Sequence, residues 1–166
     1  MTKNFKTSVP FVIVSVAILW AAYHSIVQMR SYFLNDTIEH RLGLAWREKG
    51  SFDEFDSIRG LFARNEALTT ANPRTFFLAG NAQMRWVLNG MPENKQELRD
   101  TLTIAEHYYV KSLNLQPDNP FNWLNLANVL QHQAEKKSIF DFSLKQAEKY
   151  GRTQAAVIQT LTKLKK

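Results

Sequence analysis

Residues 9–27 contain no Asp, Glu, Lys or Arg, and this run constrains the fold more than any other part of the chain. As a helix rising about 1.5 Å per residue, the run is about 28 Å long, close to the hydrocarbon thickness of a bilayer. Lys3 and Lys6 precede it, and Trp20 and Tyr23 lie toward its far end, where interfacial aromatic residues are common. We therefore predict a membrane anchor over residues 9–28, after a short tail of residues 1–8.

A cleaved signal peptide and a buried helix of a soluble domain are the alternatives for this run. The apolar stretch continues through Ser25, Ile26 and Val27, and no small-x-small cleavage site follows a polar region, which favours a retained anchor. Lys3, Lys6 and the free amino terminus favour an N-terminus in the cytoplasm. We expect a single-pass protein of the inner membrane, with the following domain on the outer face of that membrane, which in a Gram-negative bacterium is the periplasm.

Residues 105–130 carry the clearest helical pattern in the rest of the chain. Two helices are expected here, separated by the segment QPDNP. Asn119 is placed to cap the second helix, and Pro120 suits its first position, where a missing N–H costs nothing. The packing positions of the two helices are Ala105, Tyr109, Ser112, Leu113, Trp123, Leu126, Ala127 and Leu130.

This spacing resembles the tetratricopeptide repeat (TPR), a helix–turn–helix unit of about 34 residues. Residues 105–117 match the second half of one unit, and residues 123–130 match the first half of the next. The resemblance implies helical hairpins that stack on one another. Small residues lie where two helices cross closely, and large apolar residues fill the space between hairpins.

An earlier stretch fits the same pattern less closely. Residues 42–52, LGLAWREKGSF, resemble the first half of a unit. Residues 52–68 are expected to form its partner helix, with Ser51 and Glu54 as a capping box. This first unit is degenerate, because its second helix is several residues longer than the family norm.

The middle unit begins like the third. NPRTFFLAGNAQ from Asn72 aligns with NPFNWLNLANVL from Asn119, at an offset of 47 residues. The extra length falls around residues 89–94, in a hairpin loop that tolerates insertion or contacts a partner. Asn94 and Glu97 offer a capping box for the helix that follows.

The C-terminal part completes the expected fold. Ser138 is expected to cap a helix running to Tyr150, with Gly151 as its stop, and residues 153–165 form a last helix that covers the end of the stack. The fold class is therefore all-α. It comprises one N-terminal transmembrane helix, about three TPR-like hairpins and a C-terminal capping helix, with residues 29–166 as one helical-repeat domain.

The sequence contains no motif of an enzyme or of a metal site. There is no Gly-rich phosphate loop, no G-x-S-x-G and no H-E-x-x-H. His40, His107 and His132 are scattered, and the lack of Cys excludes disulfides and thiolate metal sites. We expect no catalysis, no cofactor and no metal, so the function must lie in binding.

The resemblance implies that the first helices of successive hairpins line a concave groove. The family often uses Asn there to bond the backbone of a bound peptide. Asn81 and Asn128 occupy the same repeat position, and Arg85 and His132 match one turn further on. The candidate partner-binding residues, including two neighbours of the groove by the same register, are Asn81, Arg85, Asn128, His132, Arg47 and Gln131. The alternative is a solvated inner face, or Asn side chains that bond a neighbouring helix.

The net charge of +6 lies at the two ends of the chain. Residues 1–34 carry three basic residues and no acid, and residues 131–166 carry eight basic and three acidic residues. The basic C-terminal residues are Lys136, Lys137, Lys145, Lys149, Arg152, Lys163, Lys165 and Lys166. They are candidates for contact with an anionic lipid or glycan, or they form a solvated face. No nucleic acid is expected, because no recognition motif or aromatic interleaving accompanies them.

Small anchored proteins of this layout resemble accessory components of bacterial envelope machines, including VpsP-type exopolysaccharide-biosynthesis proteins. The resemblance implies an adaptor that sits in the bilayer through residues 9–28 and docks other envelope proteins in its groove, in polysaccharide biosynthesis or export. An assembly factor for pili or cytochrome maturation is one alternative. Binding of an anionic glycan or lipid by the basic C-terminal region is another. The oligomeric state is left open.

Overall fold

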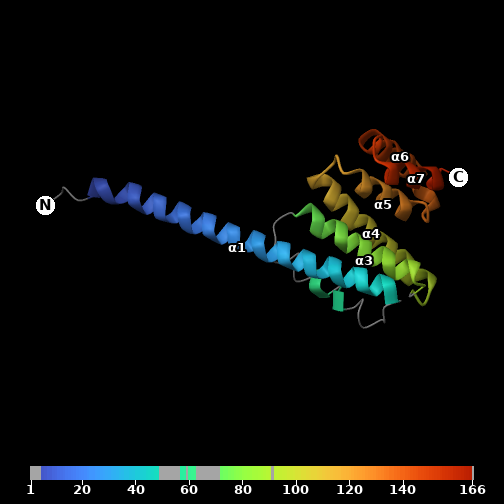
Figure 1. Cartoon of the computed structure of the whole chain (residues 1–166), viewed down its shortest axis with the longest axis horizontal. Helices are drawn as coiled ribbons and strands as arrows, with labels where there is room; N and C mark the ends of the chain where they lie inside the picture. Colours follow the sequence, from blue (N-terminus) through green and yellow to red (C-terminus); the bar gives the residue numbers. More distant parts are fainter. Residues whose placement is uncertain (1–4, 49–56, 59, 63–71, 91, 166) are drawn as a thin grey trace.

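The computed structural model describes residues 5–48, 57–58, 60–62, 72–90 and 92–165. Every regular element within these residues is helical, which confirms the predicted all-α class. The named elements are α1 (Phe5–Glu48), α3 (Pro73–Leu88), α4 (Lys95–Leu115), α5 (Pro120–Leu130), the short 3-10 helix η1 (Ala134–Lys136), α6 (Lys137–Gly151) and α7 (Ala155–Leu164) (Figure 1).

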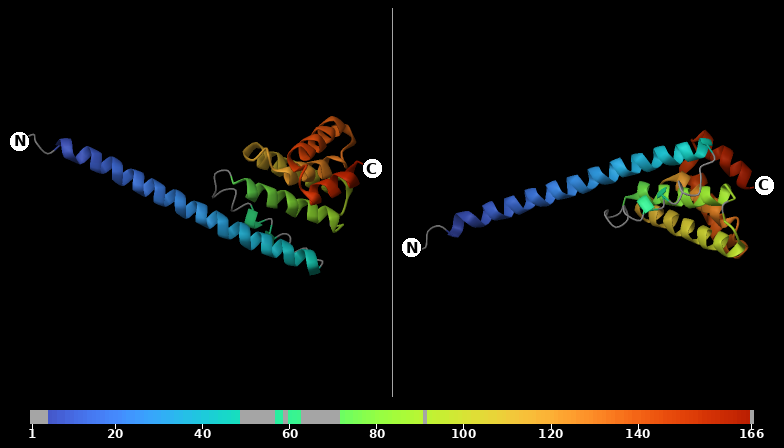
Figure 2. Two further views of the ribbon diagram at one scale, coloured as in Figure 1. Left: turned by 45° about the horizontal axis from the view of Figure 1, so that its top comes forward. Right: turned by 90° about the horizontal axis from the view of Figure 1, so that it is seen from below.

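α1 is one continuous helix of 44 residues. At about 1.5 Å per residue it is about 66 Å long, and its N-terminal part extends away from the other helices (Figures 1 and 2). Its segment Val12–Gly43 is long and apolar enough to cross a membrane. Large apolar side chains there, such as Ile18 and Leu19, are exposed. The predicted boundary between residues 28 and 29 falls inside this helix, so the apolar run and the first helix of the predicted repeat domain are one element.

The C-terminal half of α1 packs against α3 through one narrow face. Ser31, Asn35 and Ile38 are buried, at the spacing of successive turns on one side of a helix. The Asn72 side chain donates to the Ser31 hydroxyl at 3.3 Å, and the Thr75 hydroxyl donates to the Asn35 side chain at 3.0 Å. The two helices therefore run in the same direction, joined by polar contacts at one end and by apolar packing further along.

The later helices form two antiparallel hairpins, α3 with α4 and α5 with α6, and α7 packs on α5 and α6. Apolar side chains are buried in three clusters, each shared by neighbouring elements. One joins α1, the helical residues Ile58, Leu61 and Phe62, and α3. The next joins α3, α4 and α5, and the last joins α5, α6 and α7. A core divided in this way belongs to a stack in which each unit contacts only its neighbours.

Three helix starts follow the predicted Asn caps. The side-chain oxygen of Asn72 accepts from the Arg74 N–H at 3.0 Å, and that of Asn119 accepts from the Phe121 N–H at 3.0 Å. Asn94 likewise accepts from the N–H of Glu97 at 2.9 Å. In a capping box the Glu97 carboxylate would accept from the N–H of the cap residue, Asn94. Here it accepts instead from the N–H of Glu93, one residue earlier, at 2.7 Å. Each cap satisfies donors that the first turn of a helix leaves open.

Predictions for α6 are wrong at both of its ends. Ser138 does not cap the helix, because η1 leads directly into α6 and the N-cap position falls on Lys136, which makes no side-chain cap bond. Gly151 is the last residue of α6 and lies inside the helix. A Cβ on Gly151 would lie 2.4 Å from the Val157 side chain, so close packing of α7 explains this glycine. The last helix is also shorter than expected, Ala155–Leu164.

The partner helix expected over residues 52–68 is described only in part. Residues 57–58 and 60–62 are helical, and Ile58 and Phe62 are buried against Ile38 and Leu78. The expected capping box of Ser51 and Glu54 lies outside the described residues.

Candidate functional site

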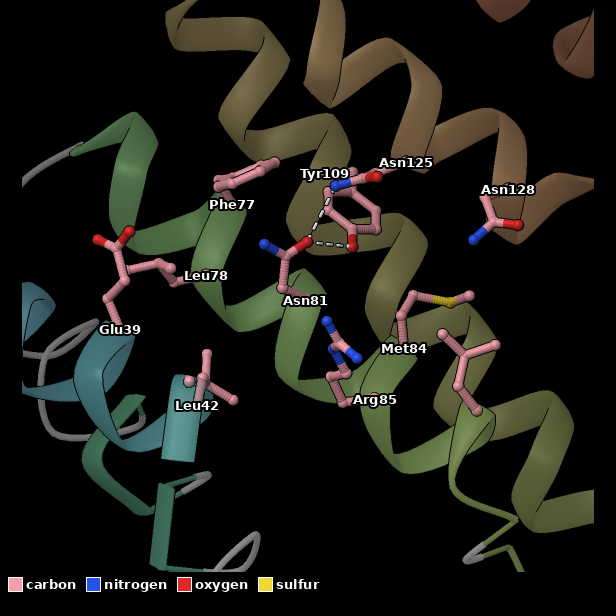
Figure 3. A pocket seen from close by; sticks show the side chains of 12 residues that line it. Glu39, Leu42, Phe77, Leu78, Asn81, Met84, Arg85, Tyr109, Asn125 and Asn128 are labelled. Atoms are coloured by element: carbon pink, nitrogen blue, oxygen red, sulfur yellow. Dashed lines mark hydrogen bonds between the residues drawn. The ribbon is translucent and has the colours of Figure 1, made fainter. Parts of the chain in front are cut away.

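A cleft of about 430 Å³ opens between the C-terminal part of α1, the length of α3 and the facing side of α5. These are the helices that the repeat pattern assigns to a concave face. The side chains around the cleft are apolar on its walls and carry amide and charged groups between them (Figure 3). The lining residues are Glu39, Leu42, Gly43, Phe77, Leu78, Asn81, Met84, Arg85, Leu88, Tyr109, Asn125 and Asn128.

Asn81 connects three helices at the centre of this cleft. Its side-chain oxygen accepts from the Tyr109 hydroxyl at 2.8 Å and from the Asn125 amide at 2.9 Å. Tyr109 belongs to α4 and is 1% exposed, whereas Asn125 belongs to α5. In Figure 3 the Asn81 amide nitrogen points away from these two partners, toward the side where Leu78 lies. Asn81 thus holds the hairpins together through its oxygen and presents its nitrogen to the cleft.

Arg85 lies one turn beyond Asn81 on the same face of α3 and supplies positive charge to the cleft. Partial burial lowers the pKa of Arg85 to about 10, so the guanidinium remains charged at neutral pH. Burial raises the pKa of Tyr109 above its ordinary value, so its phenol stays protonated and donates to Asn81. A cation that has lost part of its water interacts more strongly with an anion than an exposed one does.

Asn128 lies on α5 at the edge of the cleft. Its side-chain oxygen accepts from the Gln131 amide at 2.6 Å. Gln131 and His132 are exposed in the turn after α5 and do not line the cleft. His132 does not match Arg85 in space because α5 ends at Leu130, whereas α3 continues to Leu88, several residues further along the aligned register.

The six predicted partner-binding residues therefore divide into three groups. Asn81, Arg85 and Asn128 line one cleft, and Gln131 and His132 lie beside it on the surface. Arg47 is in the last turn of α1, and its side chain lies outside the described residues.

Several cleft residues were not predicted. Asn125 lies one turn before Asn128 on the same face of α5, and the residue aligned with it in the middle unit, Leu78, also lines the cleft. The alignment of the two units already placed Leu78 and Asn125 at equivalent positions. They were not recognised as cleft residues because one is a leucine and the other an asparagine. Glu39 and Leu42 reach the cleft because α1 continues into the domain as one helix.

The charge around the cleft is uneven. The Glu39 carboxylate is paired with Arg74 at the outer side of α3, and the Arg74 guanidinium also lies over the Tyr32 ring. Arg85 therefore supplies the positive charge of the cleft, with three asparagine amides close by. Such groups can hold a peptide backbone or a carboxylate by hydrogen bonds. Within the described part of the chain, no three His, Asp or Glu residues are grouped to hold a metal ion.

The basic C-terminal residues do not form one patch. Lys136 pairs with Glu106 of α4 at 2.5 Å, and Lys165 pairs with Glu148 of α6 at 2.9 Å. Lys149 and Arg152 lie at the C-terminal end of α6 instead, and Lys163 lies in the last turn of α7. Lys166 is outside the described residues. The charge is therefore distributed over both ends of the domain.

No protein-family model matches this sequence, and no curated protein matches it.

Proposed function

We propose that this protein is a membrane-anchored adaptor of the TPR-like type, which docks a segment of a partner protein in the cleft between α1, α3 and α5. The observation that carries the proposal is the gathering of Asn81, Arg85 and Asn128 in one cleft on the face that the repeat pattern designates for binding. A cleft of about 430 Å³ is of the size of ordinary ligand sites.

The proposed membrane attachment rests on α1. Its exposed apolar segment is long enough to span the bilayer, and lysines precede it in the sequence. We propose that α1 crosses the inner membrane once and that the repeat domain lies in the periplasm. Attachment by a continuous helix keeps the cleft near the membrane, where subunits of an envelope complex would present their own segments.

The chemistry of the cleft suits an extended peptide that carries an acidic group. Amides of Asn81, Asn125 and Asn128 can bond backbone N–H and C=O groups, and the Arg85 guanidinium can pair with a carboxylate. Leu42, Phe77 and Met84 line the walls of the cleft and offer apolar contacts. On the resemblance to VpsP-type proteins, we assign the partner to a machine of exopolysaccharide biosynthesis or export.

The test is site-specific photo-crosslinking in native membranes. Leu88 is 60% exposed at the edge of the cleft, so a photoreactive amino acid in its place faces a bound partner without disturbing the core. We expect a crosslinked partner protein that is lost in Arg85→Glu and in Asn128→Ala. Arg99→Glu is the matched control, because Arg99 is an exposed basic residue of α4 outside the cleft. Asn81→Ala is unsuitable, since it would leave Tyr109 and Asn125 without their acceptor.

Each outcome has a definite meaning. A partner that survives both cleft variants would refute docking in the cleft. Recovery of glycosyltransferases or polysaccharide export subunits supports the assigned pathway, whereas pilus or cytochrome-maturation subunits would replace it. Capture of glycan or lipid alone, weakened by salt, would favour binding through the basic residues, since such binding depends on screened charges.

A further inference from the structure

Hydrogen bonds identify one end of the repeat domain as the end from which α1 emerges. Asn72, at the start of α3, bonds Ser31 of α1, and the next residue, Pro73, accepts from the Ser112 hydroxyl at 2.6 Å. Ser112, near the end of α4, accepts in turn from the Asn122 amide at 2.9 Å. The start of α3, the end of α4 and the start of α5 therefore lie together, on the side of the protruding helix (Figure 1).

The end of α6 joins the same group. A Cβ on Gly151 would lie 3.0 Å from the Pro120 side chain, which places the last turn of α6 beside the first turn of α5. We call this part of the molecule the stalk end, comprising residues 30–33, 72–76, 111–122 and 149–152. α7 ends on the opposite side of the domain (Figures 1 and 2).

The stalk end lies close to the level where the apolar run of α1 stops. Ser31, the first buried contact with the domain, lies four positions after Val27, the last residue of that run. In an α-helix four residues span about 6 Å. If α1 crosses the bilayer as proposed above, the stalk end is therefore level with the headgroups or just above them.

The side chains of the stalk end have the chemistry of an interfacial surface. Tyr32 and Phe33 are 67% and 68% exposed on α1, and Leu115 and Phe121 are 41% and 42% exposed at the turn between α4 and α5. Aromatic and apolar groups of this kind favour the headgroup region of a bilayer. The exposed basic residues of this end are Arg30, Arg74, Lys149 and Arg152, and its exposed acid is Asp118. Arg74 is paired with Glu39 of α1.

The opposite end of the domain also exposes apolar side chains, Leu88 at 60% and Ile139 at 46%, and it differs from the stalk end in its charges. Exposed Glu93 and Glu135 lie beside exposed Lys95 and Lys137, so acidic and basic groups alternate there. We infer that the stalk end is a lipid-contacting surface, whose aromatic side chains enter the headgroup region and whose basic side chains pair with anionic headgroups. This inference rests on the proposed membrane span of α1. It fixes the domain against the bilayer at two places, the helix itself and the turn between α4 and α5.

The chain contains no Cys, so single-cysteine labelling of the full-length protein is direct. Asp118→Cys and Glu135→Cys are a matched pair, because both replace an exposed carboxylate and they flank opposite ends of α5. Each variant carries a fluorophore and is reconstituted in phosphatidylcholine vesicles with about one quarter phosphatidylglycerol and a headgroup-nitroxide lipid. We expect several-fold stronger quenching at position 118 than at position 135.

A third label separates this inference from the membrane span itself. Ile18→Cys lies in the middle of the apolar run of residues 9–27 and should be quenched by a lipid with its nitroxide on the acyl chain. Loss of quenching at position 18 would refute the membrane span. Quenching at position 18 with equal, weak quenching at positions 118 and 135 would refute the lipid contact alone.

Charge reversal tests the proposed electrostatic part. Lys149→Glu/Arg152→Glu should reduce the quenching at position 118 several-fold, and high salt or purely neutral lipid should act in the same direction. Lys137→Glu/Lys163→Glu changes the net charge equally with exposed residues outside the stalk end. Equal loss in both double variants would contradict a specific contact through α6 and would indicate an effect of net charge only.

Discussion

Gly80 shows how one residue sets the distance between two helices. A Cβ at this position would lie 2.6 Å from the Tyr109 ring, so α3 and α4 approach more closely than any larger residue permits. We expect Gly80→Ala to lower the free energy of unfolding by about 1–3 kcal/mol through overpacking. Gly43→Ala is the control, since no atom lies within 4 Å of its added Cβ. The free energy of unfolding of Gly43→Ala should rise by about 0.5–1 kcal/mol, because alanine is more favourable than glycine inside a helix. Thermal unfolding in detergent measures both changes.

Tyr109 gives the protein a predictable response to alkaline pH. Its phenol is buried and its pKa is raised above 10.0, so the folded state keeps the proton after the unfolded state has lost it. The stability that this group contributes is complete below about pH 10 and is lost as the pH rises further. The lowered pKa of Arg85, about 10, acts in the opposite sense, but Arg85 is present in all the proteins compared.

We therefore predict that Tyr109→Phe is less stable than the wild type at neutral pH, by about 1–2 kcal/mol, because Asn81 loses a donor. The difference should shrink as the pH rises above 10. Urea denaturation across this range measures it, with Tyr32→Phe as an exposed control. A difference that stays constant with pH would mean that Tyr109 ionises normally in the folded state.

Part of the cleft was predictable from single residues. Asn81 and Asn128 were found because they recur at one repeat position, and a recurring position faces the same way in each unit. Whether an asparagine there binds a partner or a neighbouring helix depends on the distance to Tyr109 and Asn125, which the sequence does not contain. Asn81 in fact bonds both.

At the scale of the helix, the starts were predictable where the signal is local. Asn72, Asn94 and Asn119 each cap a helix by a bond that spans two or three residues. The limits of α6 were not predictable, because Gly151 is selected by contact with Val157 of another helix. The continuity of α1 was not predicted either. The composition changes after residue 28 from uncharged and apolar to mixed, and this change predicted a boundary, although it does not by itself interrupt a helix.

Ser112 provides a test of how the elements are joined at the stalk end. It is fully buried, donates to the Pro73 carbonyl and accepts from Asn122. We expect Ser112→Ala to cost about 1–3 kcal/mol of stability, because it leaves the buried Asn122 amide without an acceptor. Ser143→Ala is the matched control. Ser143 is equally buried but bonds only Ile139 of its own helix, so its loss should be nearly neutral. Equal losses of stability in the two variants would show that the lost side-chain volume, and not the lost polar contact, causes the destabilisation.

For the whole molecule, the fold class followed from the sequence because a stack of hairpins is built from contacts between neighbours. The three core clusters each join elements that are adjacent or nearly adjacent in the chain. Local patterns therefore predict most of the architecture. The cleft is a property of several units together, and its shape depends on how α1, α3 and α5 are spaced.

The proposed topology predicts opposite accessibility for the two ends of the chain. Because lysines near the amino terminus favour retention in the cytoplasm, Thr2→Cys should react with a membrane-impermeant maleimide only after permeabilisation. Lys163→Cys, exposed in the last turn of α7, should react in cells whose inner membrane is intact. The reverse pattern would place the repeat domain in the cytoplasm.

Because α1 is continuous, the direction in which the cleft faces depends on the number of helical residues between the membrane and the domain. One residue inserted after Gln28 would turn the whole domain by about 100° about the helix axis while raising it only about 1.5 Å. Seven inserted residues, close to two full turns, would restore the facing direction and raise the domain about 10 Å. We predict that photo-crosslinking from Leu88 is lost with one added residue and recovers with seven. A rigid helix of this kind therefore fixes the rotation of the domain about the membrane normal, so the cleft can reach partners on one side of the protein and not those on the other side.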